Sequence, residues 1–303
     1  MNRFTARMKT ILRAITLKRY RKRARFKRMK HCALDRALKQ VANLPIRSEA
    51  AHHRLPGTLI VSMTSYPARF EALQLTLKCL MNQTVRPDLI ILWVAGEEMS
   101  LIPESLKRLQ GAEFIIRGCD DFRSYNKLVH ALREYPHAFV ITVDDDVMYE
   151  LDCIERLVRA YDTVEPTVVC HRAHRPTYSK DGKLNPYRDW QRRVDDAPSE
   201  LPSEDLFPTG VGGVLYPPGS LSPAVLNTSL MMELCPTCDD SWFFFQGRQA
   251  GSKVRRAPGA SSQPIEWPST QAGALRTQHE GGRKDEQLQA LCRHLGLPRE
   301  LPA

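Results

Sequence analysis

Short apolar runs alternate with segments of helical spacing through the middle of the chain. The runs Leu59–Met63, Leu89–Val94 and Ala138–Val143 are almost continuously apolar, which is typical of strands buried on both faces of a parallel sheet. Between these runs, apolar residues recur every three or four positions, as they do along one face of a helix. The same patterns predict helices at Arg69–Met81, Pro103–Leu109, Asn126–Arg133 and Cys153–Tyr161, and further strands at Glu113–Ile116 and Thr167–Cys170.

The order of these elements predicts the fold class. Strands and helices alternate as β-α-β-α-β, which indicates an α/β domain with a mostly parallel central sheet flanked by helices. Ligands bind such sheets in the crevice beyond the carboxyl ends of the strands. After residue 171 the chain changes to loops rich in Pro, Asp and Arg, a Gly-rich segment at Gly210–Gly213 and an aromatic stretch at Trp242–Phe245. We interpret this part as binding loops on the sheet, with helices predicted at Asp240–Ala250 and Lys284–Leu295.

The first fifty residues differ from the rest. Apolar residues at three- and four-residue spacing over Met8–Ile15 predict a short amphipathic helix that continues into the polybasic segment Lys18–Lys30. Pro and Gly near residues 43–45 and 55–57 then indicate a linker. The predicted organisation is a basic leader over residues 1–50, a catalytic domain over 57–272 and a helical C-terminal extension over 273–303.

Composition and charge exclude several classes of protein. The 303 residues are 42% apolar, enough for a large core and too many for a mostly disordered chain. No run of about eighteen uncharged apolar residues occurs, so no membrane-spanning helix is expected. Residues 1–30 hold thirteen Lys and Arg and no acid, which leaves the other 273 residues with a net charge of −3. Only the leader is therefore basic enough to bind nucleic acid through charge.

The eight cysteines are scattered rather than densely and regularly spaced. Several lie in apolar surroundings where a thiol behaves as a small buried hydrophobic group, and the N-terminus lacks an intact export signal, so a reducing cytoplasm is expected. Cys235 and Cys238 form one pair without a second at zinc-finger spacing. A zinc or redox role is the alternative to two buried thiols. The histidines at 171 and 174 are expected to be structural or exposed.

Three aspartates, Asp144, Asp145 and Asp146, follow the predicted strand Ala138–Val143 directly. In extended chain, residues two apart point the same way, so Asp144 and Asp146 can share a face while Asp145 points to the other. Two converging carboxylates repel unless a cation lies between them, and hard oxygen ligands suit Mg²⁺ or Mn²⁺. The alternative is a solvated acidic turn that caps the next helix.

A second acidic pair, Asp239 and Asp240, opens the helix predicted from residue 240. The helix dipole stabilises a carboxylate there as the anion, which suits a general base and equally suits an N-cap. Lys127 begins a helix before the central strand, where it is either a cation within reach of a diphosphate or a surface lysine. The segment Gly210–Tyr216, which includes Gly212 and Gly213, either lets the backbone approach a ligand closely or uses its glycines only for bends.

Taken in chain order, these motifs resemble nucleotide-sugar-dependent glycosyltransferases with the GT-A (Rossmann-like) fold, similar to glycosyltransferase family 2 and its bacterial polysaccharide relatives. The resemblance covers roughly residues 58–293. The matching segments are Val61–Pro67 with the first strand and nucleotide-binding turn, Asn126–Leu128 with the Lys-Leu before the central strand, Val143–Asp146 with the Asp-x-Asp motif, Gly212–Tyr216 with the loop beside the donor sugar, Asp239–Trp242 with the acceptor-side acidic pair, and His279–Asp285 with the C-terminal segment near the metal.

The resemblance implies the roles of individual residues. Mn²⁺ or Mg²⁺ would be held by Asp144, Asp146 and His279 and would neutralise charge on the departing nucleoside diphosphate. Asp240 would take the proton from the acceptor hydroxyl in an inverting transfer, with Asp239 as the alternative base. The implied donor-binding residues are Thr64, Ser65, Tyr66, Arg69, Lys127, Asp145 (on the ribose), Gly212 and Gly213. The implied partners are a nucleotide-sugar donor and a saccharide or lipid-linked acceptor, in synthesis of a cell-surface polysaccharide.

Two other functions are considered. A sugar-nucleotide nucleotidyltransferase also uses acids at a strand end, but it usually begins with a Gly-rich, basic loop where this chain has Thr64–Pro67. Nucleic-acid binding through the basic arm is disfavoured by the net charge of −3 beyond residue 30. For the leader we predict binding to an anionic membrane surface on the cytoplasmic side, the alternatives being a soluble basic tail and a nucleic-acid arm.

Overall fold

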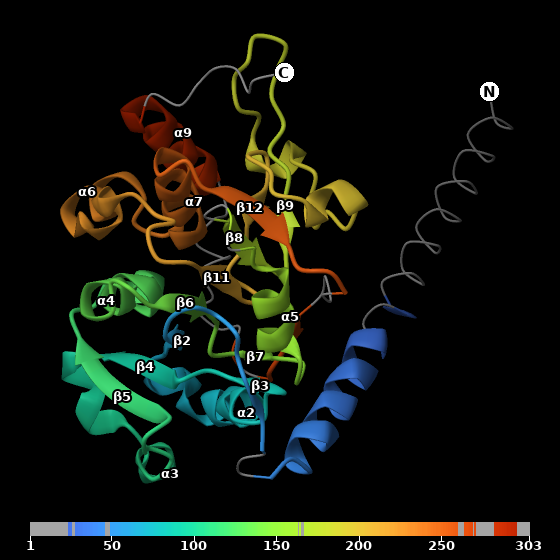
Figure 1. The fold of residues 1–303 in the computed structure, drawn as a ribbon, viewed down its shortest axis with the longest axis vertical. Helices are drawn as coiled ribbons and strands as arrows, with labels where there is room; N and C mark the ends of the chain where they lie inside the picture. The colour runs from blue at the N-terminus through green and yellow to red at the C-terminus, as the bar shows by residue number, and fades with distance from the viewer. Residues whose placement is uncertain are drawn as a thin grey trace, which may run out of the picture. The chain divides into compact units, whose positions relative to one another are not determined.

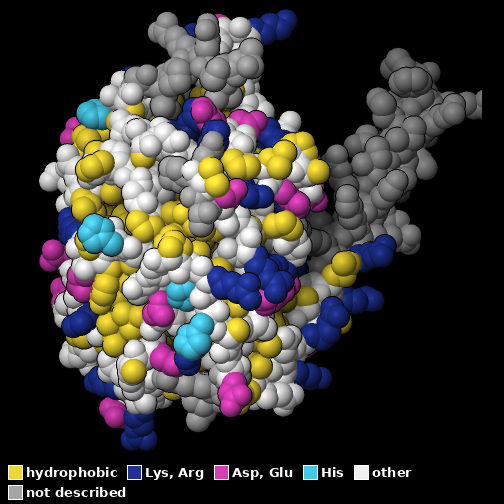
Figure 2. Space-filling view, viewed as in Figure 1, with side chains coloured by type: hydrophobic (Ala, Val, Ile, Leu, Met, Phe, Trp, Pro, Cys, Tyr) yellow, Lys and Arg dark blue, Asp and Glu magenta, His cyan; other side chains and the backbone are white. Residues whose placement is uncertain are grey.

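The computed structural model describes residues 24–25, 28–45, 49–162, 164, 167–259, 264–268, 270 and 282–295. The chain divides into two compact units, residues 1–44 and residues 45–303. In the first unit, residues 28–42 form a helix, and Figure 2 shows its Lys and Arg side chains in dark blue. The amphipathic helix predicted over Met8–Ile15 lies outside the described residues. None of the described helices is long and apolar enough to cross a membrane.

A seven-stranded sheet forms the centre of the second unit, with the strand order β12-β8-β11-β6-β2-β4-β5 (Figure 1). β2 pairs in parallel with β4 and β6, β4 with β5, and β8 with β12, whereas β11 runs antiparallel to β6 and β8. The predicted α/β class with a mostly parallel sheet is therefore confirmed. The strands are β2 (Leu59–Thr64), β4 (Leu89–Ala95), β5 (Phe114–Cys119), β6 (Phe139–Thr142), β8 (Thr167–Cys170), β11 (Val214–Tyr216) and β12 (Lys253–Arg256).

Helices cover both faces of the sheet, which explains why β2, β4 and β6 are apolar on both faces. α4 (Asn126–Glu134) packs on β2, β4 and β6, and its Leu128 and Val129 join Ile60 and Val140 in one core cluster. α2 (Phe70–Leu80) lies against the opposite face (Figure 1). α5 (Cys153–Ala160) contacts β8 and β11. The remaining described α-helices are α3 (Glu104–Lys107), α6 (Thr228–Leu234), α7 (Asp239–Gln249) and α9 (Arg283–Leu295).

Two strands of the sheet were not predicted. β12 reads Lys-Val-Arg-Arg and so lacks an apolar signature, yet its Arg256 is buried and its Nη2 lies 2.8 Å from a carboxylate oxygen of Glu200. β11 is only three residues long and follows the Gly-rich segment directly. Both are held by pairing with β8, which is a tertiary constraint that local periodicity does not contain.

Short two-stranded pairings fix the loops around the sheet. β9 (Ala173–His174) pairs with β10 (Phe207–Pro208) and so closes the base of the long loop between them. β7 (Val147–Met148) pairs with β13 (Ile265–Glu266), which brings that segment beside the three aspartates. A third pair joins β1 (Ala51–His52) to β3 (Val85–Arg86).

His171, directly after β8, is a buried neutral histidine. Its Nε2 lies 2.9 Å from the carbonyl oxygen of Cys153, and burial lowers its pKa from 6.5 to about 4. The unfolded chain therefore binds a proton at a higher pH than the folded protein. The stability contributed by the neutral ring is complete above the unfolded pKa of 6.5 and is lost as the pH falls toward the folded pKa of about 4.

We expect the free energy of unfolding to fall by about 2 kcal/mol through His171 between roughly pH 7.5 and pH 5, measured in urea. In His171→Gln that part of the pH dependence should disappear, whatever packing penalty the substitution adds at neutral pH. The exposed His137 is the matched control, and His137→Gln should keep the wild-type slope. An unaltered slope in His171→Gln would contradict the assignment.

Candidate active site

The three consecutive aspartates lie just beyond the carboxyl end of β6, and Asp145 is the most firmly held of them. One of its carboxylate oxygens accepts a 2.6 Å hydrogen bond from the Ser65 hydroxyl, and the other accepts a 2.7 Å bond from Arg69 Nη1. Ser65 directly follows β2, and Arg69 ends a short 3-10 turn (Pro67–Arg69) before α2. Thr76 on α2 also donates to the backbone carbonyl of Asp145. The turn after β2 therefore positions the acids after β6.

Asp146 and Asp144 are less completely compensated. Arg69 Nη2 lies 3.2 Å from Asp146 Oδ2, but burial and the charge of Asp144 together raise the pKa of Asp146 to about 7. Asp144 Oδ1 lies 2.9 Å from Lys127 Nζ, and its backbone N–H donates to the Tyr149 hydroxyl at 2.7 Å. These two carboxylates are thus close enough to repel each other.

Lys127 joins the two acidic motifs. Its Nζ lies 2.9 Å from Asp144 Oδ1 and 3.0 Å from Asp239 Oδ2, and the residue is only 6% exposed. Burial alone would lower the pKa of Lys127, but the carboxylates of Asp144 and Asp239 raise it well above its ordinary value. The lysine is therefore a fixed cation that holds the first turn of α4 against the end of β6 and the start of α7.

Asp240 faces the same cluster from the first turn of α7. Its Oδ1 accepts a 2.8 Å hydrogen bond from the Gly210 N–H. Burial and the neighbouring charge of Asp239 raise the pKa of Asp240, although the side chain is only partly buried by area. A carboxyl group with a raised pKa beside a fixed cation is a physical signature of a general base.

Gly210 opens the Gly-rich segment that the sequence marks as able to approach a ligand, and it lies at the acidic cluster. A Cβ at this position would lie 3.1 Å from Asp240 Oδ1, 3.1 Å from Lys127 Nζ and 3.9 Å from Asp144 Oδ1. A larger residue would therefore require Asp240 or Lys127 to shift by a few tenths of an ångström. Gly212 and Gly213 instead have φ of 111° and 100°, and a Cβ on either would face His171. They shape the turn into β11. The sequence therefore indicated a Gly-rich segment but did not show which of its glycines lies against the aspartates.

The other residues from the resemblance lie around this cluster or outside the described ranges. The Thr64 hydroxyl donates to the carbonyl oxygen of Trp93, and Arg69 lies 5.3 Å from the centre of the Tyr66 ring. His279 lies outside the described residues. Cys235 and Cys238 are buried free thiols, and Cys235 Sγ lies 3.2 Å from the carbonyl oxygen of Cys238. Both thiols are buried, as expected.

The carboxylates at this edge suit a hard divalent cation. After burial, Asp144 is the largest influence that raises the pKa of Asp146, and Glu266 on β13 adds to it, so a cation placed there would relieve real repulsion. Within the described ranges, no three His, Cys, Asp or Glu side chains are arranged to hold a metal by themselves. Asp144 and Asp146 therefore fit a cation that takes its other ligands from water or from substrate oxygens.

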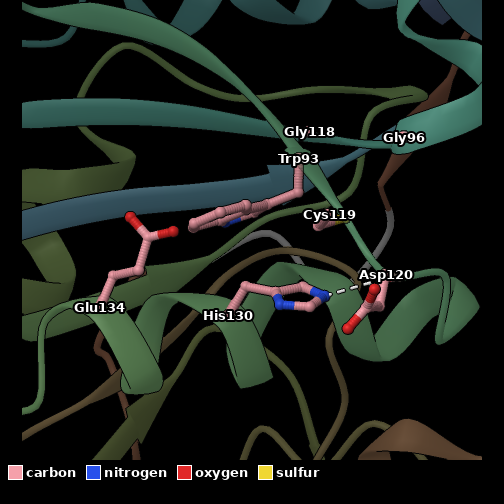
Figure 3. Close-up of a pocket in the computed structure, with 7 residues that line it drawn as sticks. All are labelled: Trp93, Gly96, Gly118, Cys119, Asp120, His130 and Glu134. Atoms are coloured by element: carbon pink, nitrogen blue, oxygen red, sulfur yellow. Dashed lines mark hydrogen bonds between the residues drawn. The ribbon is translucent and has the colours of Figure 1, made fainter.

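A separate cavity of about 430 Å³ opens beside α4. Figure 3 shows His130 and Glu134 extending from α4 toward Trp93, with Asp120 at the far side. His130 Nε2 lies 3.0 Å from the carbonyl oxygen of Asp120, and burial lowers the pKa of this imidazole. The cavity shares no lining residue with the acidic cluster. We assign the chemistry to the cluster, because Asp144 and Asp239 converge there on the cation Lys127, and their neighbours Asp146 and Asp240 have raised pKa values.

No protein-family model matches the chain, and no curated protein matches it by sequence. Solved structures similar to it include a CMP:2-keto-3-deoxy-manno-octonic acid synthetase complexed with CTP (14% identity, covering 76% of this chain and 98% of that chain, TM-score 0.40). Another is the inositol-1-phosphate CTP transferase from T. maritima (13% identity, 79% and 98%, TM-score 0.41). A third is GalNAc-T7 with UDP, GalNAc and Mn²⁺ (12% identity, 67% and 42%, TM-score 0.43). At these low values, what the site does is inferred from its own residues.

Replacement of Lys127 tests whether it holds the site together. Lys127→Met should lower the free energy of unfolding by about 3 kcal/mol, because it leaves the buried Asp239 and the partly buried Asp144 without their shared cation. Urea unfolding at neutral pH in EDTA measures the change. Adding Asp239→Asn should recover part of the loss by removing one of the two stranded charges. The control is Lys107→Met on the exposed side of α3, and a Lys127→Met effect no larger than this control would argue against the bridge.

Proposed function

We propose that this chain is a metal-dependent glycosyltransferase that moves a sugar from a nucleotide-sugar donor to a hydroxyl group of a saccharide or lipid-linked acceptor. The observation that supports this most is the convergence of two acidic motifs on Lys127. Asp144 and Asp239 both lie within 3.0 Å of its ammonium group, and Asp240 follows Asp239 at the start of α7. The motif Asp144–Asp146 suits a cation and a diphosphate. The pair Asp239 and Asp240 suits a general base that takes the proton of a hydroxyl group.

On the donor side, Asp144 and Asp146 would hold Mn²⁺ or Mg²⁺, together with His279 in the family pattern. When bound, the ion supplies neutralisation of the charge that develops on the leaving nucleoside diphosphate. Lys127 offers a fixed positive charge beside Asp144 for the same phosphates. Asp145 has both oxygens engaged by Ser65 and Arg69, but each oxygen retains a further acceptor position for a ribose hydroxyl.

On the acceptor side, Asp240 is better suited than Asp239 to act as the base. Asp239 is buried and ion-paired to Lys127, so its charge is already compensated. Asp240 is partly exposed, and its pKa is raised toward the operating pH, first by burial and then by Asp239. It would take the proton from the acceptor hydroxyl during an inverting attack, with the Gly210 N–H fixing the orientation of its carboxylate.

A nucleotidyltransferase is the second candidate, since it also needs acids at the end of a strand. The acidic pair at the start of α7 favours glycosyl transfer, because a carboxylate with a raised pKa beside the donor site is what a hydroxyl acceptor requires. The turn after β2, Thr64–Pro67, also lacks the Gly-rich basic loop that such enzymes usually place there.

Two substitutions separate metal binding from base catalysis. A thermal-shift panel of nucleotide sugars with and without Mn²⁺ should first identify a donor that raises the melting temperature. Asp146→Asn should lose the Mn²⁺-dependent shift. Asp240→Asn should keep that shift but lose about 10²- to 10⁴-fold in sugar transfer, because only the base is removed.

The exposed Asp162 supplies the control, and Asp162→Asn should behave as the wild type. Undiminished turnover of the wild-type protein in excess EDTA would contradict the assignment of a metal. Product in which the nucleotide rather than the sugar is transferred would favour the nucleotidyltransferase.

We also propose that the leader brings the enzyme to the cytoplasmic face of an anionic membrane, where a lipid-linked acceptor would lie. The thirteen cations of residues 1–30 would each contribute about 1 kcal/mol near such a surface. Full-length protein should float with liposomes that contain anionic lipid, and protein without residues 1–30 should not. Equal flotation of the two proteins would refute this role, and liposomes of neutral lipid serve as the control.

A further inference from the structure

The long loop between β9 and β10 returns to the active site and is anchored on α9. The backbone N–H of Tyr187, at its centre, donates to Asp285 Oδ1 at 2.7 Å. The Tyr187 ring packs against Trp190, at 4.9 Å between ring centroids, and against Phe207 at 6.3 Å. This aromatic contact places an otherwise irregular loop at a fixed position beside the start of β10.

Cations gather on this aromatic platform. Lys284 Nζ lies 3.7 Å from the centre of the Tyr187 ring, and Arg192 Cζ lies 5.1 Å from it. Arg172, two residues beyond β8, donates from Nη1 to the Thr209 hydroxyl at 2.9 Å. Its Nε is buried and has no hydrogen-bond partner among the described residues. We call Arg172, Arg192, Arg193 and Lys284 the cationic cluster.

These cations differ from their neighbours in lacking anionic partners. In the same loop Arg175 pairs with Asp196 and Asp205, and Arg188 lies near Asp189. No described carboxylate lies within ion-pair distance of any member of the cationic cluster. Burial lowers the pKa of Arg172; Tyr187 and Asp240 oppose this effect, and the charges of Arg193 and Arg192 add to it.

The cationic cluster lies near Asp240. Thr209, which accepts from Arg172, immediately precedes Gly210, whose N–H binds Asp240. The charge of Asp240 acts on Arg172, and both Lys284 and Lys127 act on Asp240. Asp240 is therefore close both to Lys127 and to the cationic cluster.

We infer that the cationic cluster is an acceptor subsite for an anionic group, a phosphate or a carboxylate, carried by the saccharide whose hydroxyl faces Asp240. This inference rests on the proposed function. Arginine and lysine bind such groups through charge-assisted hydrogen bonds, and an aromatic platform limits the freedom of the cations that lie on it. The donor diphosphate is the other possible source of an anion, but Lys127 and Arg69, which contact Asp144 and Asp145, are the cations available to it.

Three monosaccharide probes of matched size test this inference by isothermal titration of the full chain: glucose, glucuronate and glucose 6-phosphate. We expect at least one anionic probe to bind about tenfold or more tightly than glucose, since a hydrogen bond to a charged group contributes about 1.5–3 kcal/mol. The double variant Arg192→Ala/Lys284→Gln should bind that anionic probe no more tightly than glucose. Arg188→Ala in the same loop removes an exposed cation outside the cluster and should retain the wild-type preference.

A second titration, with UDP and Mn²⁺ present, distinguishes the two sources of the anion. The anionic probe should still bind, because the donor and acceptor sides are separate. Displacement by UDP would overturn the inference by placing the anion on the donor side, and equal affinity for glucose and both charged probes would overturn it directly. The proposed function fails by a different result, namely the absence of any Mn²⁺-dependent shift with nucleotide sugars.

Discussion

The ion pairs of one buried lysine organise the candidate site at the end of the sheet. Lys127 is stable as a cation only while Asp144 and Asp239 both lie within 3.0 Å of it, because the attraction must offset the cost of its burial. Those carboxylates belong to the end of β6 and the start of α7, which are far apart in sequence. The site therefore forms only after α4, β6 and α7 have packed. A displacement of any one of these elements would break an ion pair with another.

Much of the sheet could be predicted because its strands are apolar on both faces. β2, β4 and β6 have that pattern. Because the aspartates directly follow β6, they could be predicted to lie at the carboxyl edge of the sheet, where ligands bind. β12 could not be found in this way, since Lys253 and two arginines hide a strand that pairing with β8 defines. A buried strand can be recognised in the sequence by its run of apolar residues. A charged strand whose partners are far away in the sequence gives no such local signal.

The same limit explains what the sequence left out of the site. Gly210 carries no local sign that sets it apart from Gly212 and Gly213, and only the distances to Asp240 and Lys127 do so. The loop between β9 and β10 is irregular by itself. Its position depends on distant partners, among them the β9–β10 pair, the contacts of Arg256 with Glu200 and the bond from Tyr187 to Asp285, made by residues nearly a hundred positions apart. The sequence therefore shows how many cations the loop contains, but not where in the structure they lie.

The two acidic motifs follow one electrostatic plan. In each, adjacent aspartates have different surroundings. Ser65 and Arg69 oppose the effect of burial on the pKa of Asp145, and Lys127 pairs with Asp239. In Asp146 and Asp240 a neighbouring acid adds to the effect of burial, so these carboxyl groups are better able to take a cation or a proton. Identical side chains at consecutive positions differ because the fold supplies them with different partners.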